Sequence, residues 1–500
     1  MASVCLSLTG KTIEENLAAL ERYRDKVDLV ELRVDWLEPE EQFLVRSFPA
    51  LAGLPTILAV RRRIDCGVFD EGEGVRLVII AKALTYARSD NKANFAFVEL
   101  EDDFRVPSIE DTCRVFGTRI IRSRHFAKGM PDNLDTVWNA LASEQGVIPK
   151  LAVTPRSSAD LASLISWAKT LPSSERIIVG MGDYGYPTRI LSPQLGSMFS
   201  YSSALSFGMP MAAPGHFDPE KFADTYRGRE STKDFMIYAL AGGKSIMESK
   251  SPALHNAAFR EAGIDAVYVP FPSDSAKGFL DAIEAAGARG AAVTIPLKES
   301  IIPCLCRTSP EVDDIGACNT IVKTGKGWEG FNTDASGFER SLLEFLGRDS
   351  LEGMRATLVG AGGAAKAVAL VLARQKASCV VLNRSVAKAK ALAKRYGFLW
   401  GPADDRSLDL VTDHSDLVIQ GTSVGMTGGT PGDPLEWYEF QGHEAVFDII
   451  YRPERTELLA RAEKAGCRVI NGYPMLCYQA ADQFRIWTGL TPPEVYRGEG

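Results

Sequence analysis

Two lysines in different chemical settings could each take part in a reaction. Lys150 lies in Gly-Val-Ile-Pro-Lys-Leu-Ala-Val, a short apolar run that predicts a buried strand. Burial removes water from an ammonium group and favours its neutral form, which is a nucleophilic amine. Lys298 lies in Ala-Val-Thr-Ile-Pro-Leu-Lys-Glu and is followed by polar residues up to Asp334 and by a glycine-rich turn at 360–363. This order predicts two enzymes in tandem.

The polar residues of the first half lie near the ends of expected strands. A lysine and a histidine on neighbouring strands suit imine chemistry, because the amine condenses with a ketone and the imidazole moves the protons. Arginines can hold a carboxylate with two hydrogen bonds. The candidates are Glu31, Arg33, Arg61, Ser123, His125, Lys150 and Arg189. On composition alone, a solvated Lys150 and a hydrogen-bonded core His125 are the commoner outcomes, and Arg62 and Arg63 are expected to be solvated.

A glycine-rich turn marks the second candidate site. Between an expected strand at 357–359 and an expected helix at 364–374 lie Gly360, Ala361, Gly362, Gly363 and Ala364. Such a turn lets the backbone approach a pyrophosphate at the N-terminus of the helix. The next strand, 379–382, ends in Asn383, Arg384 and Ser385, where an NAD site would tend to place an acid. Arg384 and Lys388 can instead neutralise a 2′-phosphate, which favours NADP over NAD.

Composition and charge favour a small, soluble ligand. The chain has 500 residues, more than one hydrophobic core usually organises, so two or more domains are expected. A formal charge of −8 and a pI near 5.5 provide no diffuse positive field for nucleic acid or an anionic membrane. The 9 cysteines include no Cys-x-x-Cys pair and predict reduced thiols without a metal site. The N-terminus does not resemble a signal peptide, so a cytoplasmic protein is expected, with a monomer as its assembly.

Strands and helices alternate along the chain. The first half predicts a closed (β/α)₈ barrel, because each parallel strand needs a crossover helix, and its expected strands are 4–8, 29–34, 56–61, 95–100, 119–122, 150–153, 177–181 and 199–205. A polar segment at 226–234 predicts a linker. The second half begins at 235 with further strands expected at 236–240, 266–269 and 290–294.

Motifs of the first half resemble type I 3-dehydroquinate dehydratase: Glu-Leu-Arg-Val-Asp, Ser-x-His-Phe, Ile-Pro-Lys-Leu-Ala and Ala-Pro-Gly, in this order. The resemblance implies a TIM barrel at 1–225, a Schiff base between Lys150 and the ketone of 3-dehydroquinate, and proton transfers by His125. It implies a carboxylate anchor at Arg189, with Glu31, Arg33 and Arg61 arranging the ring hydroxyls and the histidine. Asp65 and His216 stand where the family has glutamate and glutamine, so substrate binding is expected to differ there.

Motifs of residues 235–490 resemble shikimate dehydrogenase: Val-Thr-Ile-Pro-Leu-Lys, Gly-Ala-Cys-Asn-Thr-Ile, Asn-Thr-Asp-Ala-Ser-Gly-Phe, Thr-Ser-Val-Gly-Met and Gln-Ala-Ala-Asp-Gln-Phe. The resemblance implies a two-lobed α/β fold, with a substrate-binding domain at 235–335 completed by a helix at 475–490 and a Rossmann-type NADP domain at 336–474. Lys298, beside Asp334, is implied as the proton donor when hydride reaches C3 of 3-dehydroshikimate. The implied substrate contacts are Ser249, Ser251, Thr294, Asn319, Tyr451 and Gln479, and the implied nicotinamide loops contain Thr422, Ser423, Gly472 and Met475.

Simpler structural explanations exist for some of these residues. Ser251 fits the N-cap of a helix with Pro252 at its first position. Lys298 and Asp334, taken as a lone pair, fit a surface salt bridge. Glu248 and Gln420 replace a histidine and an asparagine of the family, so substrate affinity or pH dependence is expected to shift.

Together, the resemblances predict a bifunctional enzyme that dehydrates 3-dehydroquinate to 3-dehydroshikimate and reduces the latter to shikimate with NADPH. Two alternatives stay open: an NAD-dependent quinate dehydrogenase in the second half, and a metabolite-sensing regulator that keeps the folds without the chemistry. Retention of Lys150, His125, Lys298 and Asp334 together argues against the regulator.

Overall fold

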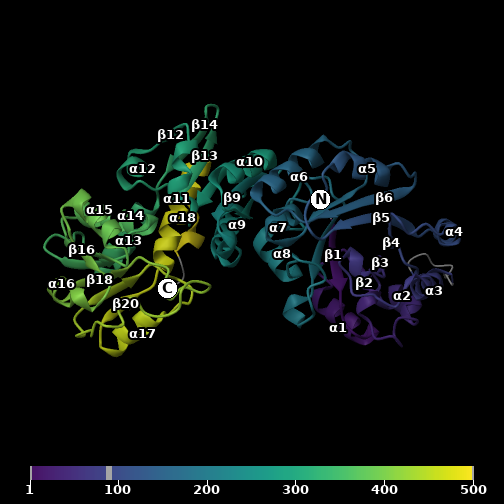
Figure 1. Cartoon of the computed structure of the whole chain (residues 1–500), viewed down its shortest axis with the longest axis horizontal. Coiled ribbons are helices and arrows are strands. Elements are labelled where there is room, and N and C mark those ends of the chain that lie inside the picture. The colour runs from purple at the N-terminus through teal and green to yellow at the C-terminus, as the bar shows by residue number, and fades with distance from the viewer. Residues whose placement is uncertain (1–2, 86–92, 498–500) are drawn as a thin grey trace. The chain divides into compact units, whose positions relative to one another are not determined.

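Three β-sheets follow one another along the chain in the computed structural model, which describes residues 3–85 and 93–497 (Figure 1). The chain divides into two compact units, Met1–Ala239 with Ile264–Ala288 and Leu240–Gly263 with Arg289–Gly500. The domain bounds expected from the sequence, with a linker at 226–234, stay a prediction. In that segment the Arg229 side chain is held, because Nη2 donates to Asp28 Oδ1 at 2.9 Å.

The first sheet has eight parallel strands in the order β7-β6-β5-β4-β3-β2-β1-β8. The strands are β1 (Ser3–Leu8), β2 (Leu29–Arg33), β3 (Thr56–Ala59), β4 (Phe97–Glu101), β5 (Arg119–Phe126), β6 (Val147–Val153), β7 (Ile177–Gly180) and β8 (Phe199–Ser203). The crossover helices are α1 (Ile13–Tyr23), α2 (Phe48–Ala52), α3 (Glu73–Leu84), α4 (Pro107–Phe116), α5 (Leu134–Ala142), α6 (Ser158–Thr170) and α7 (Gly182–Ile190), with α8 (Pro219–Tyr226) after the last strand. This arrangement confirms the predicted (β/α)₈ barrel, including its eighth strand.

The seam between β7 and β8 is closed by isolated hydrogen bonds rather than by a ladder. The Met198 amide donates to the Arg176 carbonyl at 2.8 Å, and the Ile178 amide donates to Ser197 Oγ at 3.1 Å. Apolar side chains fill the interior, among them Cys5, Ile57, Ile148, Ala152 and Tyr201. The strands are therefore buried on both faces, as expected for a parallel sheet covered by helices.

The second sheet has six strands in the order β10-β9-β11-β13-β14-β12. They are β9 (Met236–Gly242), β10 (Ala266–Pro272), β11 (Ala288–Val293), β12 (Arg307–Thr308), β13 (Thr320–Thr324) and β14 (Gly327–Phe331). Its helices are α9 (Ser251–Glu261), α10 (Ala276–Ala286), α11 (Leu297–Ser300) and α12 (Pro310–Ile315), with α18 (Tyr473–Thr488) near the end of the chain. The sequence predicted β9, β10 and β11, whereas the antiparallel hairpin of β13 and β14 was not expected.

The third sheet has six strands in the order β17-β16-β15-β18-β19-β20, which is the doubly wound order of a Rossmann-type domain. The strands are β15 (Arg355–Val359), β16 (Ser378–Asn383), β17 (Leu399–Pro402), β18 (Leu417–Gln420), β19 (Ala445–Asp448) and β20 (Arg468–Ile470). The helices are α13 (Asp334–Leu346), α14 (Gly363–Arg374), α15 (Val386–Tyr396), α16 (Leu408–Asp413) and α17 (Glu457–Lys464). The α/β class predicted for the second half is thus confirmed.

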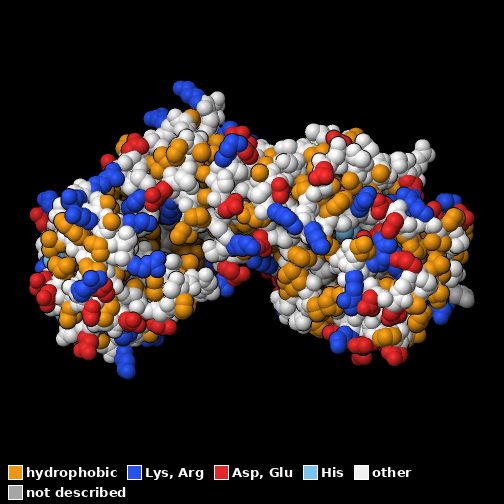
Figure 2. All heavy atoms as spheres, in the orientation of Figure 1, with side chains coloured by type: hydrophobic (Ala, Val, Ile, Leu, Met, Phe, Trp, Pro, Cys, Tyr) orange, Lys and Arg blue, Asp and Glu red, His pale blue; other side chains and the backbone are white. Residues whose placement is uncertain are grey.

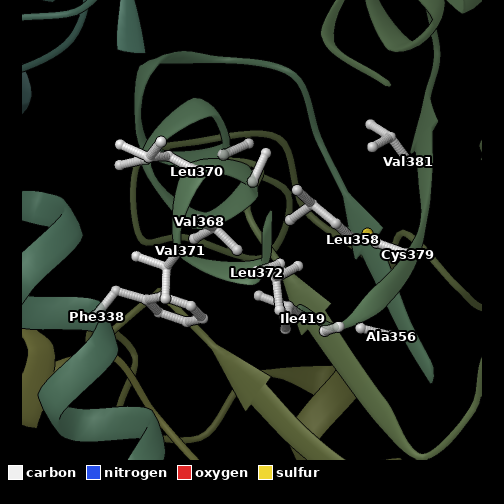
Figure 3. Packing of buried hydrophobic residues seen from close by; sticks show 14 of the residues in the cluster. Phe338, Ala356, Leu358, Val368, Leu370, Val371, Leu372, Cys379, Val381 and Ile419 are labelled. Carbon is white, nitrogen blue, oxygen red and sulfur yellow. The ribbon is translucent and has the colours of Figure 1, made fainter. Parts of the chain in front are cut away.

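The core of this domain is centred on α14, which packs against the strands and α13 (Figure 3). Val368, Val371 and Leu372 lie in one buried cluster with Phe338 of α13 and Ile419 of β18. The alanine-rich sequence of α14 favours the helix and keeps its side chains short. The helix therefore packs closely and holds the glycine turn that precedes it.

One expectation about a helix start was wrong. Ser251 was expected as the N-cap of α9, but it is the first residue of that helix, and the preceding Lys250 makes no capping hydrogen bond with its side chain. Ser249 Oγ accepts from the Ser251 amide at 3.1 Å instead. The helix starts one residue earlier than expected because Lys250, which follows the extended Ser249, already has helical backbone angles.

Residues 3–85 and 93–497 contain no helix whose length and hydropathy would let it span a bilayer. Within the same residues, His, Cys, Asp and Glu side chains form no group of three or more that could hold a metal ion. On the visible face, Lys and Arg side chains are interspersed with Asp and Glu side chains (Figure 2).

We expect Leu372→Ala to lower the free energy of unfolding by about 2–5 kcal/mol, because truncation of a fully buried leucine leaves a cavity. Leu399→Ala is the matched control, because Leu399 lies in β17 of the same domain with 47% of its surface exposed. Amide hydrogen exchange of peptides from β15 and β16 measures the effect, with the barrel strands as internal reference. Equal loss of protection in both variants would contradict this core.

Candidate active sites

The first cavity lies inside the barrel, towards the C-terminal ends of the strands. It has a volume of about 20 Å³, and its lining includes Glu31, Arg61, His125, Lys150, Arg189, Tyr201 and His216. Side chains alternate along a strand, so Lys150 shares the inward face of β6 with Ile148 and Ala152. The structure therefore brings together the predicted imine-forming lysine, the histidine and two of the arginines.

Lys150 is buried next to a carboxylate. Its Nζ lies 2.7 Å from Glu99 Oε2 and 4.2 Å from the centroid of the Tyr201 ring, and only 4% of the residue is exposed. Burial lowers the pKa of Lys150 and the charge of Arg61 lowers it further, so that it stays below its ordinary value although Glu99 and Glu31 raise it. Lys150 therefore loses its proton to form the neutral amine at a lower pH than an exposed lysine does.

Glu99 was not recognised in the sequence, yet it is at the centre of this site. Its Oε2 also lies 2.9 Å from Arg61 Nη2, and its Oε1 lies 3.4 Å from His125 Nε2. Burial alone would raise the pKa of Glu99, but Arg61 and Lys150 outweigh it and hold that pKa well below its usual range. The available signal was an acid within the apolar run Phe-Val-Glu-Leu-Glu of a strand expected to be buried.

His125 is a neutral imidazole with unused hydrogen-bonding capacity. Burial lowers the pKa of His125 well below its ordinary value, and Arg61 adds to the lowering, although Glu99 opposes both. Neither ring nitrogen has a hydrogen-bond partner within the described part of the chain. The ring can therefore accept a proton from a molecule in the cavity.

Arg189 and His216 also line this cavity. Arg189 Nη2 donates to the Pro214 carbonyl at 3.1 Å, while its Nε and Nη1 have no partner among residues 3–85 and 93–497. Burial lowers the pKa of Arg189 to about 9. His216 Nδ1 lies 2.8 Å from Ser203 Oγ. Unpaired, buried guanidinium nitrogens at this place fit the carboxylate of a bound acid.

Three candidates from the sequence do not line the cavity. Arg33 forms a buried bidentate pair with Asp35 at 2.8 and 2.7 Å and donates to the Ala212 carbonyl at 3.0 Å. Asp65 pairs with Arg62 at 2.6 Å. Ser123 is fully buried. Arg33 thus connects β2 to the loop after β8, and its contact with a substrate, like that of Asp65, stays a prediction.

The second cavity is larger, at about 600 Å³, and lies within the second compact unit. Most of the predicted residues line it: Ser249, Ser251, Thr294, Lys298, Asn319, Asp334, Gly360, Ala361, Gly362, Gly363, Ala364, Asn383, Thr422, Ser423, Tyr451, Gly472, Met475 and Gln479. The reactive pair and the glycine turn therefore face the same space.

Lys298 and Asp334 form a partly buried ion pair. Lys298 Nζ lies 2.5 Å from Asp334 Oδ2, and Asn319 Nδ2 donates to Asp334 Oδ1 at 2.9 Å. Asp334 is the first residue of α13, where the helix dipole favours a carboxylate. The side chains of Lys298 and Asp334 are 16% and 8% exposed, so this pair is not the surface salt bridge considered from the sequence.

The glycine turn has the geometry of a phosphate-binding loop. Gly360 has a φ of +123°, and a Cβ there would lie 2.8 Å from the Gly421 carbonyl oxygen. A Cβ at Gly362 would meet no atom within 4 Å, so open space lies in front of the N-terminus of α14. These residues fit the pyrophosphate of a dinucleotide.

Arg384, Ser385 and Lys388 do not line this cavity but are exposed just beyond the end of β16. No ion pair of Arg384 or Lys388 occurs in the described part of the chain. Both cations are therefore available for a phosphate at the ribose end of a dinucleotide.

The two departures in this half have partners. Glu248 Oε2 lies 3.0 Å from Arg452 Nη1, and both residues line the cavity. Gln420 Oε1 accepts from the Thr422 amide at 2.7 Å, and its Nε2 donates to the Val424 carbonyl at 3.0 Å. Gln420 thus holds the loop that contains Thr422, and the charge of Glu248 is neutralised by Arg452.

Family models match the chain in four stretches. Residues 4–233 match type I 3-dehydroquinase, and residues 242–321 match the shikimate dehydrogenase substrate binding domain. Residues 344–426 match shikimate / quinate 5-dehydrogenase, and residues 472–496 match the shikimate 5'-dehydrogenase C-terminal domain.

Similar proteins cover either one half or the whole chain. Shikimate dehydrogenase (NADP(+)) of Pyrococcus abyssi is 40% identical over 256 residues, which is 51% of this chain and 93% of that protein. The chloroplastic bifunctional 3-dehydroquinate dehydratase/shikimate dehydrogenase of Arabidopsis thaliana is 28% identical over 520 residues, with 99% of this chain and 83% of that protein covered. A solved structure of dehydroquinate dehydratase and shikimate dehydrogenase from S. pombe AroM is 23% identical, with coverage of 99% and 98% and a TM-score of 0.43.

Glu99→Gln should lower the pKa of Lys150, because the carboxylate favours the charged amine and its loss leaves only the more distant Glu31 to oppose burial and Arg61. Mass spectrometry can follow the pH dependence of Lys150 carbamylation by cyanate, whose midpoint should move to lower pH. Asp65→Asn serves as control, because its carboxylate pairs with Arg62 instead. A midpoint that rises or stays constant in Glu99→Gln would refute the assigned coupling.

Proposed function

Because this chain belongs to the shikimate dehydrogenase family over its second half, and because its first half matches type I 3-dehydroquinase, we propose that it is a bifunctional enzyme. The first site dehydrates 3-dehydroquinate to 3-dehydroshikimate, and the second site reduces 3-dehydroshikimate to shikimate. The observation that carries the proposal is that each cavity is lined by a reactive set. Lys150 and His125 line the first, with Glu99 in contact with both, and Lys298 and Asp334 line the second beside the glycine turn.

In the dehydratase site, the amine of Lys150 condenses with the C3 ketone and releases water. The resulting iminium withdraws electrons and acidifies the C2 hydrogen, which neutral His125 accepts. The proton on His125 then assists departure of the C1 hydroxyl as water, and hydrolysis of the imine frees the product. Glu99 remains ionised throughout and keeps the amine and the imidazole close together, through one carboxylate oxygen each.

Arg189 supplies the recognition of the substrate carboxylate. Two of its guanidinium nitrogens are buried without a partner in the described residues, so an anion would satisfy both. His216 and Glu31 face the same cavity and fit contacts to ring hydroxyls. A carboxylated ring with several hydroxyls thus finds an acceptor or donor on each side.

In the reductase site, Lys298 donates a proton to the carbonyl oxygen as hydride arrives at the carbon. Asp334 orients the ammonium, and Asn319 holds Asp334 through its amide. Ser249, Ser251, Thr294 and Gln479 fit contacts to the carboxylate and hydroxyls of the substrate. A site built from so many fixed polar groups discriminates strongly, because an analogue that lacks a partner leaves them unpaired.

NADPH supplies the hydride when it is bound. The turn from Gly360 to Ala364 would hold its pyrophosphate, and Arg384 with Lys388 would neutralise its 2′-phosphate. The Pyrococcus abyssi relative carries NADP(+) in its name, which supports this preference. The expected monomer and cytoplasmic location stay predictions, and the Arabidopsis thaliana relative is named as chloroplastic.

A coupled assay of the purified chain tests the whole proposal. With 3-dehydroquinate and NADPH as the only reactants, nicotinamide absorbance should fall and shikimate should accumulate. Ligand binding without turnover at either site would instead favour a sensor, and oxidation of quinate with NAD would favour a quinate dehydrogenase.

Lys150→Ala should abolish dehydration and leave reduction of added 3-dehydroshikimate nearly unchanged, because the two lysines lie in separate cavities. Borohydride added during turnover should trap the substrate on Lys150 of the unmodified protein, as detected by peptide mass spectrometry. Lys298→Ala is the matched control with the opposite outcome. Absence of a trapped adduct at position 150 would exclude the imine mechanism.

Arg384→Ala should raise the KM for NADPH by about tenfold or more and change the KM for NADH little, because only NADPH carries the 2′-phosphate. Steady-state kinetics of 3-dehydroshikimate reduction with each cofactor give the comparison. Arg374→Ala removes an exposed arginine of the same domain that pairs with Asp314 of α12, and it should affect neither KM. An equal change for both cofactors would disprove the phosphate contact.

A further inference from the structure

We propose that Tyr496 and His255 are positioning residues for the Lys298–Asp334 pair, acting through a continuous hydrogen-bond chain from the C-terminal segment. His255 follows the serine motif 249–251 in the sequence, but the proposed reaction gives it no task. Neither Tyr496 nor His255 lines the cavity. The expected effect on kinetics rests on the proposed reductase activity, whereas the hydrogen-bond chain itself follows from the distances between its members.

The outer half of the chain joins three elements. Tyr496 lies in a 3₁₀ helix, Glu494–Arg497, and its hydroxyl is 2.8 Å from His255 Nδ1 in α9. His255 Nε2 is 3.2 Å from Gln483 Oε1 in α18. Tyr496 is 2% exposed and His255 is fully buried, so water does not compete for these contacts. The C-terminal segment of the protein is thereby connected to α18, the helix that borders the cavity.

The inner half leads from Gln483 to the reactive pair. Gln483 Nε2 donates to the backbone carbonyl of Asn319 at 3.3 Å and to Thr320 Oγ1 at 3.0 Å. Thr320 Oγ1 donates to Asn319 Oδ1 at 2.7 Å, and Asn319 Nδ2 donates to Asp334 Oδ1 at 2.9 Å. Lys298 contacts the other oxygen of this carboxylate at 2.5 Å. Every link from Tyr496 to Asp334 is therefore a hydrogen bond.

Each donor in this chain is determined by its neighbour. The backbone carbonyl of Asn319 can only accept a hydrogen bond, so the amide nitrogen of Gln483 must face it. The amide oxygen of Gln483 must then face His255. His255 Nε2 must then carry a hydrogen. Burial lowers the pKa of His255 to about 3, so the ring is neutral and Nδ1 accepts from the Tyr496 hydroxyl. All donors thus point towards Asp334.

A chain with one direction fixes the orientation of its inner members. Hydrogen bonds in series polarise one another, and a buried network is stable only when every member is paired. Removing the Tyr496 hydroxyl would leave His255 Nδ1 without its donor and would weaken the constraint on Gln483 and Asn319. Because Asn319 lines the cavity and holds Asp334, the loss should appear as poorer alignment of the reacting groups.

Tyr496→Phe tests this, because it keeps the ring contacts with Phe484 and His255 and deletes only the hydroxyl. We expect kcat for 3-dehydroshikimate reduction to fall about fivefold, with the KM for NADPH and the dehydratase activity unchanged. Tyr438→Phe is the matched control, because it deletes a buried hydroxyl that donates to Glu444 at 2.9 Å and takes no part in the hydrogen-bond chain. A kcat equal to that of the unmodified protein in Tyr496→Phe, or an equal loss in both variants, would overturn the proposal.

A double-mutant cycle tests whether Tyr496 acts through Gln483. In a Gln483→Leu background, which severs the chain, Tyr496→Phe should have no further effect on kcat. Independent, multiplicative losses would show that Tyr496 acts by another route and would overturn the proposal.

Nitrogen-15 NMR of histidine-labelled protein tests the chain without relying on activity. The sequence has 5 histidines, and a His255→Gln variant assigns the resonance of interest. His255 should be the Nε2–H tautomer, and Tyr496→Phe should shift its Nδ1 resonance while Tyr438→Phe should not. An Nδ1–H tautomer would refute the inferred direction. Failure of the unmodified protein to reduce 3-dehydroshikimate, with the NMR result as expected, would reject the proposed reaction but not the hydrogen-bond chain.

Discussion

The barrel site depends on the compensation of a buried carboxylate. Glu99 is 2% exposed, and an isolated charge at that depth would cost several kcal/mol. Lys150 of β6, His125 of β5 and Arg61, which follows β3, surround it. These side chains come from neighbouring strands of the sheet, β3 to β6, so the cluster that would perform the chemistry also joins those strands to one another.

The second site also contains a buried carboxylate, Asp334, whose charge is compensated by different groups. Asp334 is at the start of a helix, and its two oxygens receive Lys298 and Asn319. Its cavity of about 600 Å³ is far larger than that of the barrel, as a site for a substrate and a dinucleotide requires. Backbone geometry at Gly360 shapes one side, and hydrogen-bonded side chains shape the other. In the second site, hydrogen bonds between neutral side chains and backbone groups therefore take the place of the closely spaced ion pairs of the barrel site.

Much of the fold was predictable because hydrophobic runs of strand length recur at regular spacing. All eight barrel strands and the strand before the glycine turn were predicted. The strands β12–β14 and β17–β20 were not predicted. Those of the hairpin region, β12–β14, are short or carry polar residues on an exposed side. Glu99 was missed for a related reason: an acid in an alternating pattern also fits the solvent face of a strand. The expected cap at Ser251 was wrong because the helical backbone already includes Lys250.

The amino-acid sequence by itself determined the order of the elements, the identity of the reactive lysines and the glycine turn, because periodicity and motif spacing are local properties. Only the tertiary structure decided which charges compensate each other. It placed Glu99 between Lys150 and Arg61, turned Arg33 towards Asp35, and linked Tyr496 to His255 across 241 residues of sequence. Such pairings depend on distances between elements that are far apart in the chain, and no local pattern encodes those distances.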